Sequence, residues 1–155
     1  MLKKTITFTN FDGKEEQFTA YFNLNKTECV DLNLEYERDG GLIGRIKKLM
    51  NDTIDGEPPR KPAIDFVKLL IERSYGERPA DNPSLFLKED DEGRPLFKKF
   101  KQTAAYDAYV YALLTGEESL EEFAENVMPK VSPEQRAEAQ KIMDEEGLTQ
   151  LFTGA

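Results

Sequence analysis

The chain has 155 residues, of which 39% are apolar and 33% charged, and its formal net charge is −9 at pH 7. This length suits one domain with a core of its own, while the acidity disfavours nucleic acid as a partner because the basic residues form no evident cluster. With no histidine and one cysteine, Cys29, the chain lacks the groups of Ser–His or Cys–His catalysis and of a zinc site.

Two N-terminal segments alternate apolar with polar side chains, which predicts strands over residues 2–9 and 15–22. A two-residue turn between them would pair apolar with polar faces, and register rules disfavour such pairing. We therefore expect a three-residue or bulged turn within residues 10–13. This turn would bring together two apolar pairs, Phe8 with Phe18 and Ile6 with Ala20.

Two amphipathic helices are expected next. Asn25 followed by Glu28 has the form of a capping box and predicts a helix over residues 26–36. A glycine pair breaks it, and a second helix is expected over residues 42–53. The apolar residues expected to face inward are Val30 and Leu34 in the first helix and Leu42, Ile46, Leu49, Met50 and Ile54 in the second.

The most apolar part of the chain holds two more predicted helices, over residues 62–75 and 97–114, and one or two helical turns over residues 95–101 are expected to lead into the second. The first is apolar around most of its circumference, which is typical of a central helix, and Gly76 ends it. We expect the two helices to pack together, with an irregular acidic loop between them. Apolar residues of the second recur on one face that we expect in the core, namely Tyr106, Tyr109, Val110, Leu113 and Leu114.

The C-terminal part is predicted to hold two further helices. Residues 115–118 resemble a cap that opens a helix ending at Pro129, and the residues of this helix expected inward are Leu120, Phe123, Ala124 and Val127. Ser132 is predicted to open a last, mostly polar helix that Gly147 closes.

These elements define an α+β fold, a mainly α-helical single domain with an N-terminal β-hairpin. The expected domain covers residues 1–155. Its parts are a β-hairpin over residues 1–24, a helical core over 25–116, and C-terminal helices and tail over 117–155. No apolar run reaches the length of a membrane span, so we expect no membrane contact.

Few residues are candidates for a chemical role. Cys29 is expected to be a small buried hydrophobe, and the acidic run 89–92 a solvated turn, since it lacks the ligand spacing of a calcium loop. Tyr106 and Tyr109 are expected to pack in the core, in preference to forming a stacking platform, while Tyr111 is expected to point elsewhere. We therefore expect no catalytic residue, metal or cofactor.

One face of the helix predicted over residues 97–114 is a candidate surface for packing with another helix. Ala104, Ala108 and Ala112 form a stripe of small residues at a spacing of four, with Tyr111 beside it. Small residues let a second helix approach closely, and an aromatic next to them is a frequent anchor. The approaching helix belongs either to this chain, which is the preferred interpretation, or to a partner.

Several short motifs occur in an order that resembles the tail assembly chaperones of long non-contractile-tailed phages and prophages of Gram-positive bacteria. The resemblance covers residues 1–115. The motifs are Phe22–Glu28 after the hairpin, Gly40–Leu42, Tyr75–Gly76, Phe86–Lys88 and Phe100–Tyr106.

This resemblance implies a non-enzymatic protein that acts in the host cell cytoplasm and is absent from the mature virion. Its implied partners are the tape measure protein, which it would keep soluble, and the tail tube protein, whose assembly it would assist; self-association is left open. The alternative is a structural virion or adaptor protein of the neck or tail. Helix-in-groove recognition suits a client with apolar helical stripes.

Overall fold

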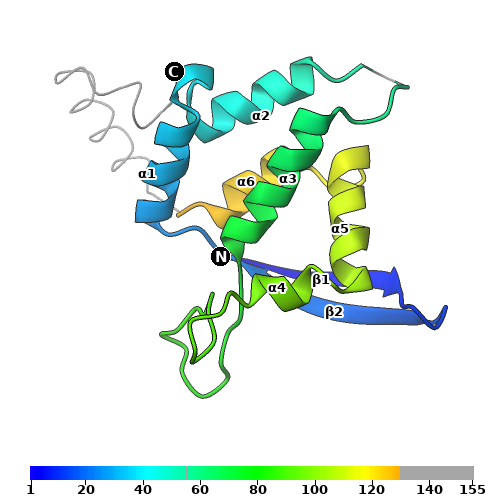
Figure 1. Cartoon of the computed structure of the whole chain (residues 1–155), viewed down its shortest axis with the longest axis vertical. Helices are drawn as coiled ribbons and strands as arrows, with labels where there is room; N and C mark the ends of the chain where they lie inside the picture. The colour runs from blue at the N-terminus through cyan, green and yellow to red at the C-terminus, as the bar shows by residue number, and fades with distance from the viewer. Residues whose placement is uncertain (55, 130–155) are drawn as a thin grey trace. The chain divides into compact units, whose positions relative to one another are not determined.

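The computed structural model describes residues 1–54 and 56–129, and within them it confirms the α+β class and the N-terminal hairpin (Figure 1). Helices dominate, and the strands form one small sheet of order β1-β2-β3. The elements are β1 (Leu2–Thr9), β2 (Glu15–Phe22), α1 (Lys26–Glu35), the 3₁₀ turn η1 (Glu37–Asp39), α2 (Gly41–Asn51), α3 (Lys61–Ser74), β3 (Tyr75–Gly76), α4 (Phe97–Phe100), α5 (Ala104–Thr115) and α6 (Leu120–Val127).

The described residues fall into two compact units. Unit 1 combines Met1–Asn23 with Lys61–Val127, and so joins the hairpin to helices α3 to α6. Unit 2 holds α1, η1 and α2 within Leu24–Arg60, together with Met128 and Pro129. The single domain expected from the sequence stays a prediction, and the expected helix from Ser132 lies outside the described residues.

The hairpin turn has three residues, Phe11–Gly13. A three-residue turn was one of the two forms expected from the sequence. The Asn10 side chain shapes it, because its Oδ1 accepts from the backbone N–H groups of Asp12 and Lys14, both at 3.0 Å. Gly13 has φ of 79°, which glycine adopts without the steric cost of a side chain. Side-chain capping by Asn10 therefore sets where the turn begins.

The register of the hairpin differs from the prediction by two residues. Ile6 lies opposite Phe18, and Phe8 lies opposite Glu16. The expected partners, Phe8 with Phe18 and Ile6 with Ala20, do not pair, because the turn begins at Asn10, earlier than that pairing requires. A shift by two residues keeps every side chain on its face, since strand side chains alternate with period two.

Unit 1 is organised around one buried aromatic side chain, that of Phe22 on β2, which is fully buried. Its ring lies 5.5 Å from that of Tyr109 on α5 and 5.3 Å from that of Phe123 on α6, measured between centroids. The rings of Tyr75 and Phe100 lie at 6.0 and 6.2 Å. Burial of one Phe side chain contributes roughly 1.5–3 kcal/mol, so this contact ties the sheet to the helices of unit 1.

Helices α3 and α5 pack against each other, as predicted, and α5 also lies against β1 (Figure 1). The buried side of α5 carries Ala105, Tyr109, Val110 and Leu113, while Tyr106 and Leu114 are half-buried. The tyrosines at 106 and 109 therefore pack in the aromatic core, as expected.

The prediction of continuous helix over residues 97–114 is wrong, but the helical turn expected within residues 95–101 is present. Two helices, α4 and α5, replace the continuous helix. Thr103 is extended between them, with φ −92° and ψ 153°. Its hydroxyl accepts from the N–H of Tyr106 at 3.1 Å and donates to the carbonyl of Phe100 at 2.7 Å. An N-cap at this point competes with continuous helix, because threonine can satisfy the free N–H groups of a new first turn.

The predicted cap over residues 115–118 is also misplaced. Thr115 is the last residue of α5, and Gly116 ends that helix in the left-handed conformation, with φ of 83°. The N–H of Glu122 donates instead to the hydroxyl of Ser119, at 3.2 Å. The predicted inward residues of α6 are confirmed, with Phe123, Ala124 and Val127 buried and Leu120 half-buried.

In unit 2 the predicted capping box is confirmed. The N–H of Glu28 donates to Asn25 Oδ1 at 2.9 Å, and the N–H of Asn25 donates to Glu28 Oε1 at 3.0 Å. Asn33 extends this polar pattern, since its Oδ1 accepts from the N–H of Leu42 at 2.9 Å and so links α1 to the start of α2.

The predicted inward residues of unit 2 are partly wrong. Leu42, Ile46 and Leu49 are buried and Val30 is half-buried, but the exposed fractions of Leu34, Met50 and Ile54 are 43%, 53% and 50%. In α1 the buried leucine is Leu32. Helix residues two apart do not share a face, so burying Leu32 turns Leu34 outward.

Gly76 was expected only to end a helix, yet it forms β3 with Tyr75 and pairs with Tyr21 of β2. Beyond it, Glu77 and Leu87 exchange two backbone hydrogen bonds of 2.8 Å. A Cβ at Gly76 would overlap the Phe86 ring and approach the carbonyl oxygen of Leu87 to 2.8 Å. The site therefore has room only for glycine.

We expect Gly76→Ala to lower the free energy of unfolding by about 1–3 kcal/mol, because the added methyl group overpacks a closed site. The measurement is chemical denaturation of both proteins. The control is Glu77→Ala, an exposed neighbour whose replacement leaves the backbone bonds in place and should change stability by no more than about 0.5 kcal/mol. Equal stability of the two variants would contradict the close contact at Gly76.

Candidate protein-interaction surface

The predicted small-residue stripe lies beside the buried face of α5. Ala104, Ala108 and Ala112 are half-buried. Tyr111 is 64% exposed, so it points away from the core, as the sequence indicated. None of the three alanines is buried, so no element among the described residues covers the stripe completely. Whether a helix of this chain or of a partner approaches it stays a prediction.

A groove lies beside this helix, between α3 and the α4–α5 junction. Its volume is about 390 Å³. The residues that line it come from both sides, namely Lys68 and Glu72 of α3 and Phe97, Lys101, Gln102 and Tyr106 of the junction. The break at Thr103 places the end of α4 and the start of α5 at this groove.

Aromatic rings form the rigid wall of the groove. The Tyr106 ring meets the rings of Phe97 and Phe100 edge to face, with centroids 5.6 Å away in both cases. Burial, with smaller contributions from the carboxylates of Glu72 and Asp107, raises the pKa of Tyr106. The phenol is therefore neutral in the physiological range and offers an apolar ring with one polar group.

Two lysines line the same groove, and two more lie in the adjoining helix α4. Lys98, Lys99 and Lys101 lie in or directly after α4, and Lys68 approaches from α3. Composition and net charge did not reveal this local cluster. The sequence signal for it was the short run Lys98–Lys101, with a phenylalanine among three lysines, in a chain of net charge −9.

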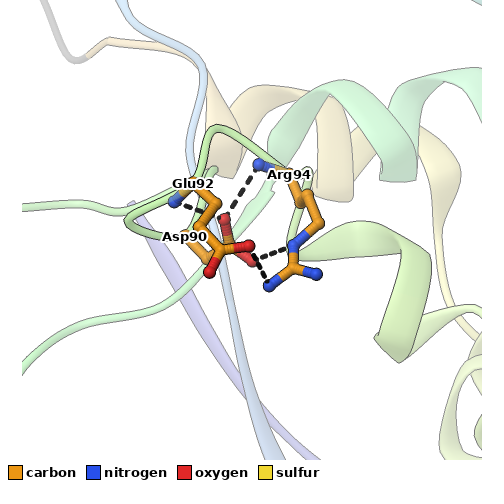
Figure 2. A network of polar contacts seen from close by, with 3 residues as sticks. All are labelled: Asp90, Glu92 and Arg94. Atoms are coloured by element: carbon orange, nitrogen blue, oxygen red, sulfur yellow. Dashed lines mark hydrogen bonds and ion pairs between the residues drawn. The ribbon is translucent and has the colours of Figure 1, made fainter.

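The acidic run 89–92 forms a compact turn (Figure 2). Asp90 Oδ1 accepts from the backbone N–H groups of Glu92 and Arg94, both at 2.9 Å. The Arg94 side chain pairs with Asp90 at 2.9 Å and with Glu92 at 2.7 Å. The backbone N–H of Arg94, followed by that of Glu92 and the Arg94 side chain, holds the pKa of Asp90 below its ordinary value. These carboxylates are occupied in shaping the turn.

Cys29 is half-buried in α1 and forms no disulfide. Across residues 1–54 and 56–129, no three acidic or cysteine side chains gather closely enough to hold a metal ion. In the same part of the chain, every helix is too short or too polar to cross a membrane.

The sequence comparisons give the class of this protein. A family model described as phage tail assembly chaperone matches residues 1–151, and the chain belongs to this family. The family supports a role in phage tail assembly, with protein partners. Neither the curated proteins nor the solved structures contain a match.

The stripe on α5 can be tested by a charge substitution. We expect Ala108→Glu to change the free energy of unfolding by about 0.5 kcal/mol or less, because a glutamate at a half-exposed position can reach water. It should weaken association with any helix that packs on the stripe, since the charge would lose water without gaining a partner. Thermal melting and a binding assay measure the two effects.

The matched control for this substitution is Ala105→Glu, at a neighbouring position that is 1% exposed. A charge there enters the core and should unfold the protein or strongly destabilise it. If Ala108→Glu is as destabilising as Ala105→Glu, another part of this chain covers the stripe, and the partner surface must lie elsewhere.

Proposed function

We propose that this protein binds the tape measure protein of its phage, keeps it soluble before the tail tube covers it, and assists tail tube assembly without catalysing a reaction. It acts in the cytoplasm of a Gram-positive host and is absent from the mature virion. The family match over residues 1–151 carries this proposal.

Exposed apolar side chains support binding to an apolar client. In unit 1, Tyr111 and the hairpin tip Phe11 are 64% and 84% exposed. In unit 2, Met50 and Ile54 are half exposed near the end of α2. A partner that covers such residues removes apolar surface from water, which is the main favourable term in protein association.

Surface charge supports the solubilising part of the proposal. The chain carries 30 acidic against 21 basic residues. A net charge well away from zero opposes aggregation. A client with apolar helical stripes, bound to such a chain, would share this charge and stay dispersed.

Co-expression tests the proposal. The tape measure protein should aggregate when expressed alone, and should stay soluble and co-purify when expressed with this protein. The control is co-expression with an unrelated acidic protein of similar size, which should leave the client insoluble. If this protein leaves the soluble fraction of the client unchanged, the proposed function is wrong.

The location of the protein is tested on purified phage particles by quantitative mass spectrometry. An assembly factor should be absent from them or present far below one copy per structural subunit. A stoichiometric amount would instead identify a structural component of the tail or neck.

A further inference from the structure

The groove between α3 and the α4–α5 junction combines positive charge with an aromatic wall in an acidic protein. Lys68 and Lys101 line it from opposite sides, and Lys98 and Lys99 belong to the adjoining helix α4. This groove lies in a chain whose net charge is −9.

The four lysines form no ion pair within residues 1–54 and 56–129, whereas several other lysines of the chain do. Lys4 pairs with Glu118, Lys48 with Asp39 at 3.1 Å, and Lys61 with Asp65 at 2.6 Å. The single carboxylate that lines the groove belongs to Glu72. Concentrated like charge is unfavourable in the free protein, and a ligand of opposite charge relieves it.

The aromatic wall of the groove can contact an apolar group of a partner. Phe97 is 7% exposed, and its ring meets that of Tyr106 at an angle of 79°. Phe100 contacts both rings, and its own ring stacks on that of Tyr75 with a distance of 4.2 Å between centroids. Rings that are already fixed lose little conformational freedom when a partner binds, which favours affinity.

We propose that this groove binds an acidic amphipathic helix, with an apolar side chain against Tyr106 and Phe97 and carboxylates paired with Lys68 and Lys101. Charge complementarity identifies the partner, since two lysines against one glutamate line the groove in a chain whose net charge is −9. The proposal rests on the proposed function for its partner, an acidic stretch of the client protein.

A polypeptide fits this groove better than a nucleic acid does. Glu72 lies among the lining residues, and it would repel a uniform chain of phosphates. A helix with mixed side chains can place a donor beside Glu72 and carboxylates beside the lysines. The aromatic wall and the lysines together match an alternation of apolar and acidic residues along one helix face.

The test uses the full chain and a synthetic fluorescent peptide, an amphipathic helix with leucine and phenylalanine on one face and glutamate on its flanks. Its charge-reversed twin, with lysine for every glutamate, and a short DNA duplex are the comparison ligands. Fluorescence anisotropy should show binding of the acidic peptide, weaker binding at high salt, and much weaker binding of the twin and the duplex.

The variant Lys68→Glu/Lys101→Glu should weaken binding of the acidic peptide by at least about tenfold. The control Lys26→Glu/Lys47→Glu changes the net charge equally at exposed positions of α1 and α2, and should change affinity by less than about twofold. Thermal melting checks that both variants fold, and Lys68→Gln/Lys101→Gln should show a smaller loss in the same direction.

Three results would overturn the groove proposal: no binding of the acidic peptide, equal loss in both double variants, or tighter binding of the duplex. The failure of the proposed function would be different, since the tape measure protein would then remain insoluble with the unaltered chain. If the client stays soluble with the Lys68→Glu/Lys101→Glu variant and binds it with unchanged affinity, the groove proposal is wrong and the proposed function stands.

Discussion

The burial of Phe22 is the contact on which unit 1 depends. Its ring touches rings from α4, α5 and α6 and that of Tyr75, which begins β3. A strand slip of one residue would turn Phe22 to the exposed face of the sheet and remove all these contacts at once. The same cluster fixes Phe100, which supports the aromatic wall of the groove. Core packing therefore positions the surface proposed to bind a partner.

The sequence predicted those features that depend on local patterns. Alternation in residues 2–9 and 15–22 indicated the strands, and the Asn25–Glu28 box marked the start of α1. Apolar spacing also indicated that α3 and α5 carry much of the core. These predictions succeeded because strand alternation, capping and helix periodicity involve neighbouring residues only.

The remaining features depend on competing interactions, and a sequence pattern does not show which of them is more stable. A side-chain hydrogen bond of Asn10 sets where the hairpin turn begins, and one of Thr103 sets where α5 begins. In both cases a neighbouring starting position was equally consistent with the sequence. The pairing of Gly76 with Tyr21 joins residues far apart in the chain. The exposure of Leu34 follows from the burial of Leu32, which only tertiary packing decides.

The stripe on α5 stays a prediction as an interaction surface, and the groove beside it was not predicted. Tyr111 and the alanine stripe were evident from helix spacing, but the groove was not, because its lining combines residues of α3 with those of a junction expected to be continuous helix. A tail assembly chaperone needs surfaces for protein partners. In unit 1 the exposed Tyr111 and the groove both lie on or beside helix α5, which the aromatic core holds through Tyr109.

Hydrogen–deuterium exchange of this protein, alone and bound to the tape measure protein, tests the central claim that the rigid core of unit 1 presents the client-binding groove. Bound client should slow exchange of the backbone amides in residues 97–106 and 68–72. The amides of β2, already bonded in the sheet, should change little. Client binding with no protection in residues 97–106, or with protection confined to the acidic turn 89–94, would contradict this account.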